Sequence, residues 1–269
     1  MHIRDVLQDV LLLAISQVRA ILAAWVQFTH IPLPPRVDGL LHINTAKPNQ
    51  AIRYLPLVNG GVGLIAGLVF WICNTATGSS SVAVIAAITT MLALTGAFRE
   101  RGAGHFFDTF SRSAVNNKAR AIGATGTIAL CMIMLAKWQL LAALPPAYVA
   151  LALAAAGSFS TFATMAFLYT HKPLLPHMHG RYTDFSHVRM SNKDFMIMAL
   201  FGMAPVALMG HPAYLVLLPL LWIIRALLGA YLTRRPERYT SDALAATQQC
   251  AELGFYLGVL IIIRILAIL

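Results

Sequence analysis

The stretch AYVALALAAAGSFSTFATMAFL, residues 147–168, decides the fold class, because it contains no Lys, Arg, Asp or Glu. A helix that crosses the hydrocarbon core of a bilayer needs about 20 predominantly apolar residues. Strands of a membrane β-barrel instead alternate apolar and polar residues over short segments. The stretch therefore predicts a membrane-spanning helix.

The rest of the chain repeats this pattern. Of its 269 residues, 58% are hydrophobic and 11% are charged, whereas soluble domains carry about 25% charged residues. Further apolar segments lie at 55–73, 82–98, 122–144, 196–209, 213–231 and 251–269. Segment 6–28 is more polar, and it either spans the membrane or lies in the interface as an amphipathic helix. We expect an all-α, polytopic membrane bundle of about seven to eight helices, with residues 1–269 as a single transmembrane domain.

The segments between the apolar runs are of two kinds, which alternate along the chain. The connections NTATGSSS, PP and GHP contain no charged residue. The others, at 30–54, 99–120, 171–195 and 232–250, contain 15 of the 20 basic residues. Successive spans place alternate segments on opposite sides of a membrane, and Lys and Arg favour the cytoplasmic side. We therefore expect charged loops, including 99–120, on the cytoplasmic face.

The net charge of +10 needs no nucleic acid to explain it, because topogenic loops and contact with anionic lipids account for such a charge. The charged segments also form one large polar face. Arginine binds phosphate oxygens bidentately, so phosphorylated substrates suit this face.

Three carboxylates on this face are candidate metal ligands: Glu100, Asp108 and Asp242. Magnesium is often held by one or two carboxylates together with substrate phosphates. Gly102 and Gly104 would let the backbone approach a ligand closely. The alternative is that 99–120 is a solvated connector with topogenic charges.

Polar residues inside apolar segments are functional candidates by default. Glu252 is one, and it either serves function or pairs with Arg225 or Arg264. Lys137 lies near a span end, where we expect its ammonium group to reach the interface. Gly63 and Gly67 have the spacing of close helix packing, within the chain or between subunits.

Five stretches, in order along the chain, resemble motifs of the cobalamin-5′-phosphate synthase (adenosylcobinamide-GDP ribazoletransferase) family. They are QFTHIPLP (27–34), IRYLPLVNGGVGLIAG (52–67), GAFRERGAGHFFDTF (96–110), NKARAIGATGTIAL (117–130) and YTSDALAATQQCAEL (239–253). The resemblance implies a bacterial inner-membrane enzyme that needs magnesium (Mg2+). Such enzymes join adenosylcobinamide-GDP to α-ribazole or its 5′-phosphate, release GMP and so complete vitamin B12.

The resemblance also implies roles for individual residues. The metal would be held by Glu100, Asp108 and Asp242. The substrate diphosphate would be gripped by Arg99, Arg101, Lys118 and Arg120. Catalytic roles would fall to Asp108, His105 and Asp242, with His105 acting as base or phosphate donor.

The acidic motif is altered in this chain, because Arg101 and His105 stand where the family has Asp, and Arg99 where it has His. The first hypothesis is a transferase in which arginines replace part of the metal site as phosphate clamps. The second is a catalytically impaired relative that binds corrinoid or partners a functional synthase. A transporter is a third hypothesis, which the one-sided polar face disfavours, because transporter sites lie near the midplane.

Overall fold

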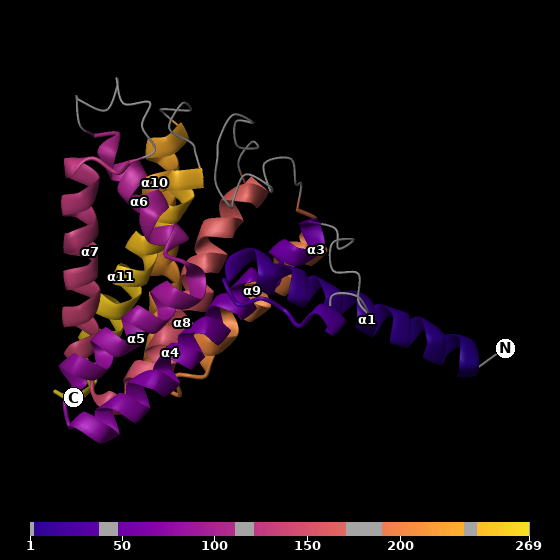
Figure 1. Cartoon of the computed structure of the whole chain (residues 1–269), viewed down its shortest axis with the longest axis horizontal. Coiled ribbons are helices and arrows are strands. Elements are labelled where there is room, and N and C mark those ends of the chain that lie inside the picture. The colour runs from indigo at the N-terminus through magenta and orange to yellow at the C-terminus, as the bar shows by residue number, and fades with distance from the viewer. Residues whose placement is uncertain (1–2, 38–47, 111–120, 171–189, 234–240, 269) are drawn as a thin grey trace.

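The structure is a computed structural model that describes residues 3–37, 48–110, 121–170, 190–233 and 241–268. All regular secondary structure in these ranges is helical (Figure 1). The helices are α1 (Ile3–Phe28), α3 (Pro48–Ile52), α4 (Leu55–Thr77), α5 (Ser80–Thr95), α6 (Phe98–Asp108), α7 (Ala124–Ala142), α8 (Pro146–Thr170), α9 (Asn192–Ala207), the 3-10 helix η4 (Pro212–Val216), α10 (Leu217–Thr233) and α11 (Ser241–Leu266). The predicted all-α membrane fold is confirmed.

Each of the eight apolar segments forms a helix, but not every helix has the length of a full span. Within the described ranges, five helices are long and apolar enough to cross a membrane. They lie at Val10–Phe28, Gln50–Thr77, Ala124–Ala142, Pro146–Phe167 and Ser241–Leu266. A sixth candidate is the pair α5 and α6, which is bent by 90°. Helices α9 and α10 are shorter, at 16 and 17 residues.

The ends of the helices separate into two edges of the molecule. The ends that flank the charged segments, among them the start of α3, the end of α6 and the start of α11, lie along the upper edge in Figure 1. The α4–α5 and α7–α8 junctions lie at the opposite, lower edge. This arrangement agrees with the alternation of charged and uncharged segments in the sequence.

The centre of the bundle is the pair α4 and α8. Small residues allow these two helices to approach: a Cβ on Gly63 would lie 2.5 Å from the Leu153 carbonyl oxygen, and one on Gly67 would lie 2.7 Å from Ala150. The prediction that Gly63 and Gly67 mediate close helix packing is therefore confirmed, and the contact is within the chain. It makes α8 the most buried candidate span.

A sharp break separates α5 from α6. Gly96 and Ala97 both have positive φ, 65° and 51°, a region that glycine adopts freely and alanine rarely. A Cβ on Gly96 would lie 2.3 Å from the His30 ring, so a side chain does not fit there. His30 also donates its backbone N–H to the Leu94 carbonyl at 2.7 Å. The break turns α6 so that its first turn is buried in the bundle.

The prediction of a charged loop over 99–120 is wrong for its first part, because Phe98–Asp108 is helical. The glycines in this stretch meet neighbouring helices. A Cβ on Gly102 would lie 2.7 Å from Ala245 of α11, and one on Gly104 would lie 2.8 Å from Leu130 of α7. The remaining residues, 111–120, lie outside the described ranges.

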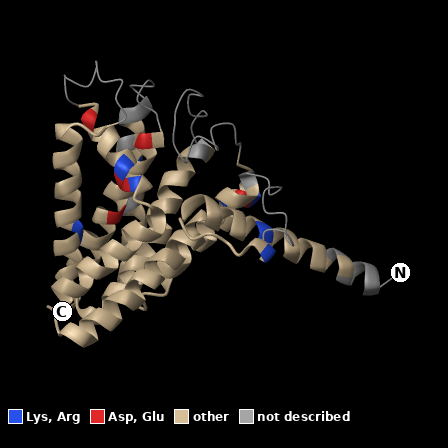
Figure 2. Cartoon of the chain, in the orientation of Figure 1, with Lys and Arg blue, Asp and Glu red and all other residues tan. Residues whose placement is uncertain are grey.

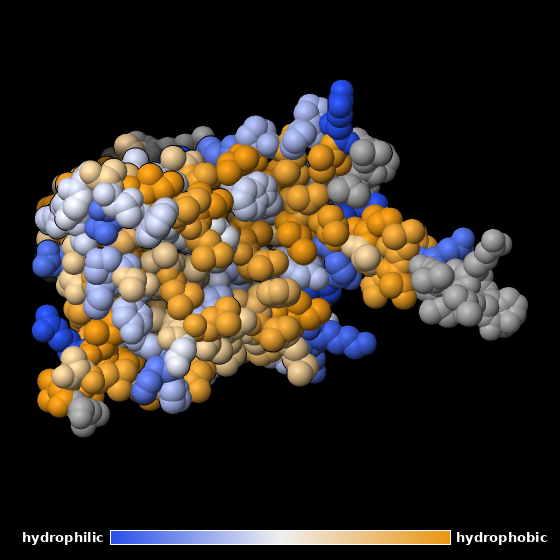
Figure 3. Space-filling model, turned by 90° about the horizontal axis from the view of Figure 1, so that it is seen from below, coloured by the Kyte–Doolittle hydropathy of each residue, from blue (hydrophilic) through white to orange (hydrophobic). Residues whose placement is uncertain are grey.

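The outer surface of the bundle is apolar, as expected for contact with lipid. Large side chains such as Leu64, Trp71, Ile128 and Leu200 are more than half exposed, and apolar residues cover much of the face in Figure 3. Helix α1 protrudes from the bundle in both Figure 1 and Figure 3.

Candidate active site

Helix α6 presents its polar residues on two faces. Arg101, His105 and Asp108 follow at spacings of four and three residues, so they share one face of the helix. Arg101 is exposed, and the other two are half-buried. Arg99 and Glu100 are buried. The helix therefore divides the predicted site residues into an outer set and an inner set.

The outer set meets the first turn of α11. Gly102 lies against this turn, because a Cβ there would be 3.3 Å from the Asp242 carboxylate. His105 lies close enough to Asp242 for the two groups to interact electrostatically. An imidazole beside a carboxylate is an arrangement that can accept and hold a proton. Two of the predicted catalytic residues, His105 and Asp242, are thus brought together.

Asp108 binds the N-terminus of α7. Its two carboxylate oxygens accept the backbone N–H groups of Gly123 and Gly126, at 2.5 and 2.7 Å. The first N–H groups of a helix have no partner within the helix, and a carboxylate there is favoured by the helix dipole. A Cβ on Gly126 would lie 2.2 Å from the Gly104 carbonyl oxygen, so the contact requires glycine. Asp108 therefore links the acidic motif directly to the glycine motif that follows it.

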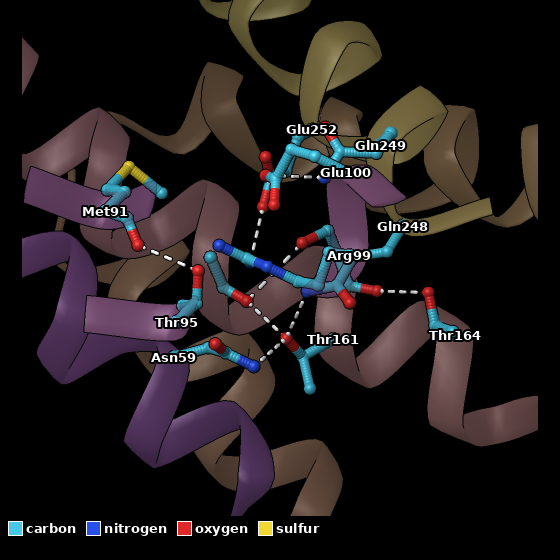
Figure 4. Close-up of polar contacts among 12 residues, drawn as sticks. Asn59, Met91, Thr95, Arg99, Glu100, Thr161, Thr164, Gln248, Gln249 and Glu252 are labelled. Carbon is cyan, nitrogen blue, oxygen red and sulfur yellow. Dashed lines mark hydrogen bonds and ion pairs between the residues drawn. The ribbon is translucent and has the colours of Figure 1, made fainter. Parts of the chain in front are cut away.

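The inner set is an ion cluster centred on Glu252 of α11 (Figure 4). Arg99 donates to one Glu252 oxygen at 3.0 Å, and Lys137 of α7 donates to the other at 2.5 Å. Lys137 also lies 3.9 Å from Glu100. Arg99 and Glu252 are at most 1% exposed. The four groups carry two positive and two negative charges, so the cluster is neutral when all are ionised.

Amide and hydroxyl groups extend this cluster toward the centre of the bundle. Gln249 donates to Glu100 at 3.0 Å, and Gln248 donates to the Thr161 hydroxyl of α8 at 2.9 Å. Thr161 also accepts from Asn59 of α4, at 2.8 Å (Figure 4). Buried polar groups of this kind fix a unique arrangement when they are satisfied. One face of α11 is therefore bonded directly to α6, α7 and α8, and through Thr161 to α4.

Two predictions about charged residues in the spans are wrong. Lys137 does not reach the interface, because its side chain is 5% exposed and pairs with Glu252. Glu252 forms ion pairs with Arg99 and Lys137, whereas the sequence suggested Arg225 or Arg264. Arg225 instead donates to the Ala166 carbonyl and lies over the rings of Trp222 and Phe167.

The three predicted metal ligands are not gathered around one point. Glu100 lies in the ion cluster, Asp108 binds the start of α7, and Asp242 lies beside His105. Among the residues that the structure describes, no group of three or more His, Cys, Asp or Glu could hold a metal ion. The described side chains thus do not form a metal site of three protein ligands, and the magnesium ligand set stays a prediction.

Of the predicted phosphate-binding residues that the structure describes, Arg101 is exposed on the outer face of α6. Arg99 lies in the ion cluster. Lys118 and Arg120 lie outside the described residues, and their roles stay predictions. Figure 2 shows that the charged residues of α6, α7 and α11 lie on one side of the bundle.

Sequence reasoning gave Lys137 no part in a site, although a signal was available. An ionisable residue within an apolar run is functional or paired in most membrane proteins. Lys137 is the one charged residue in the apolar run 122–144. Gln249 and Glu252 lie three residues apart, so they occupy the same face of α11, toward α6.

Comparison with known proteins identifies the family of this chain. Residues 20–260 match the family described as cobalamin-5-phosphate synthase. The adenosylcobinamide-GDP ribazoletransferase of Ralstonia pickettii (strain 12J) is 34% identical over 242 residues, which cover 87% of this chain and 91% of that protein. The enzyme of the same name from Ralstonia nicotianae is 35% identical over 240 residues, with 84% and 88% covered. That from Shewanella frigidimarina is 31% identical over 242 residues, with 87% and 90% covered. No solved structure matches the chain. The match over nearly the whole length means that the chain belongs to the cobalamin-5-phosphate synthase family.

Proposed function

We propose that this protein is a membrane-embedded transferase of vitamin B12 assembly. It joins adenosylcobinamide-GDP to α-ribazole or α-ribazole 5′-phosphate and releases GMP. The observation that carries the proposal is the family match over residues 20–260, which spans the helices of both site sets. The pair of His105 and Asp242 on the outer face supports catalysis in place of binding alone.

The chemistry is a transfer of a phosphoryl group between oxygens. A hydroxyl oxygen of the ribazole attacks the phosphorus attached to the corrinoid, and the bond from that phosphorus to the oxygen shared with GMP breaks. His105 accepts the proton of the attacking hydroxyl on an imidazole nitrogen. Asp242 stabilises the imidazolium that results. The negative charge of the leaving GMP faces Arg101, whose guanidinium binds phosphate oxygens.

The inner set supports these residues without touching the substrate. Arg99 and Glu100 hold the first turn of α6, and Asp108 holds its last turn against α7. His105 and Arg101 lie between these two fixed points. A catalytic group lowers the activation free energy most when its position is fixed before the reaction, because the protein then does not have to reorganise around it during the reaction.

A magnesium requirement, with the site on the cytoplasmic side of the bacterial inner membrane, is a further part of the proposal. It is supported by the family resemblance and by the diphosphate of the substrate, a common partner of magnesium. None of the steps above uses the ion. The test is GMP release before and after EDTA treatment, followed by added magnesium, and activity that survives EDTA would contradict the requirement.

The decisive experiment is an assay of purified protein in detergent with adenosylcobinamide-GDP and α-ribazole. We expect GMP release, and a fall of about 10²- to 10⁴-fold in kcat for His105→Ala, the usual worth of a general base. His211→Ala is the matched control, because His211 is exposed beyond α9, away from α6. If no GMP appears while the Ralstonia pickettii protein is active under the same conditions, the chain is an impaired relative and the proposal is wrong.

A further inference from the structure

Helix α1 divides into a packed half and a protruding half. Ala20, Ala24 and Phe28 are fully buried against the bundle, where α1 contacts α3 and α4. The four residues 10–13, one turn of helix, are 59–65% exposed although all are Val or Leu. A soluble surface rarely carries such a continuous apolar turn. The protruding half therefore needs an apolar environment.

A polar clamp sets the depth of α1 relative to the other helices. Gln17 accepts hydrogen bonds from Arg53 and from the Tyr54 hydroxyl, the latter at 2.7 Å. Arg53 in turn pairs with Asp194 at 2.9 Å. Arg53 lies just before α4, and Asp194 lies in the first turn of α9. The middle of α1 is thus tied to the level at which two other helices begin, next to charged segments.

This level is an end of the bundle and not its midplane. A helix that spans a bilayer has its middle near the bilayer centre, but Gln17 is held where α4 and α9 start. Figure 1 shows α1 leaving the bundle beside α3 and running outward at a steep angle to α7. The direction of α1 is therefore that of a membrane surface.

The sequence of the protruding half has the pattern that a membrane surface requires. Positions 4, 5, 8, 9, 16 and 19 are polar and fall on one side of a helical projection, where Leu12 and Ile15 are the exceptions. Positions 7, 10, 11, 14 and 18 are apolar and fall on the other side, where Gln17 is the exception. Helices that lie in an interface bury such an apolar side about 5–10 Å into the boundary between headgroups and acyl chains.

We infer that α1 lies in the membrane interface, on the side of the bundle where the charged helix ends lie. Its apolar side contacts the boundary between phospholipid headgroups and acyl chains. The helix rises about 1.5 Å per residue, so the half from Ile3 to Gln17 reaches about 20 Å beyond the clamp. It anchors the charged edge of the enzyme in the leaflet and leaves the bilayer core to the other helices. The 19-residue run Val10–Phe28 has the hydropathy of a span, but the clamp holds it at the surface.

The test is the depth of nitroxide labels along α1. Single cysteines are placed at positions 8, 10, 11, 14, 16 and 18 of the full chain, after Cys73, Cys131 and Cys250 have been replaced by alanine. The protein is reconstituted in vesicles of phosphatidylethanolamine and phosphatidylglycerol, and accessibility to oxygen and to a nickel complex gives the depth. Activity of each labelled protein, or its thermal unfolding, shows that it is folded.

We expect labels at 10, 11, 14 and 18 to lie about 5–10 Å below the phosphates and labels at 8 and 16 to lie near water. The depth of the labels should therefore rise and fall with the 3.6-residue period of the helix. A depth that increases steadily from 8 to 18 would mean a spanning helix. A second copy of the chain would cover the helix if labels at 10 and 11 were accessible neither to oxygen nor to the nickel complex. In that case the distances between labels of two chains would also be short. Water at all six positions would mean no partner, and each of these results overturns the inference.

Discussion

The angular position of each charged residue around α6 determines whether its side chain is buried or exposed. Arg99 and Arg101 are two residues apart, which turns their side chains by about 200°. Arg99 is 1% exposed, while Arg101 is exposed. The two arginines that the sequence grouped as phosphate clamps therefore face different environments. The separation follows only when Phe98–Asp108 is helical. The sequence favoured a loop there, because this stretch contains four charged residues and two glycines.

Glu252 is the residue whose loss should disturb the inner cluster most. Glu252→Gln removes one of two negative charges and leaves Arg99, Lys137 and Glu100 buried with a net charge of +1. Breaking a buried ion pair costs about 3–5 kcal/mol, so we expect the free energy of unfolding in detergent to fall by that amount. Chemical denaturation followed by tryptophan fluorescence measures it.

A double variant provides the control. Lys137→Met together with Glu252→Gln restores charge balance between Arg99 and Glu100, so it should be more stable than Glu252→Gln alone. A double variant that is equally or less stable would contradict the view that net charge in the cluster decides its stability.

Asp108 should contribute to stability by binding the start of α7. Asp108→Ala leaves the N–H groups of Gly123 and Gly126 without this acceptor, and we expect a loss of about 1–2 kcal/mol. Asp108→Asn keeps one acceptor oxygen and should lose less. Thermal unfolding of both variants is compared with Thr125→Ala, an exposed change in the same turn of α7. Equal stability of Asp108→Ala and wild type would refute the contact.

At the level of elements, the apolar segments were predictable because hydropathy is a local property. All eight were identified as helices from their own residues. The break between α5 and α6 was not predicted, because it depends on how His30 packs on Gly96, 66 positions later in the chain. The inner cluster was missed for the same reason: Arg99 and Glu252 are 153 residues apart. The family resemblance predicted the motif residues, but it did not predict which of them are in contact.

Two glycines of α4 offer a matched test of the α4–α8 contact. A Cβ on Gly63 would lie 2.5 Å from the Leu153 carbonyl oxygen, whereas a Cβ on Gly61 would meet nothing within 4 Å. Gly63→Ala should therefore lower stability by about 1–3 kcal/mol through overpacking. Gly61→Ala should be neutral or stabilising, because alanine favours helices. Thermal unfolding compares the two, and similar values for both would contradict the packing.

At the scale of the whole molecule, the alternation of charged and uncharged segments predicts which edge faces the cytoplasm. Ala121 and Ala147 are both exposed. Ala121 lies just before the start of α7, and Ala147 lies at the start of α8, on the opposite edge of the bundle. In a background without native cysteines, Ala147→Cys should react with an impermeant maleimide in intact spheroplasts. Ala121→Cys should react only after permeabilisation, because the positive-inside rule puts its edge in the cytoplasm. The reverse pattern would invert the topology.

The place of Glu252 on the last helix has a consequence for synthesis. The ribosome makes Glu252 153 residues after Arg99 and 115 residues after Lys137. At about 5–20 residues per second, Lys137 waits on the order of ten seconds for its counter-ion. The ion cluster can therefore form only after α11 has been made. A chain that ends before α11 carries Arg99 and Lys137 without Glu252.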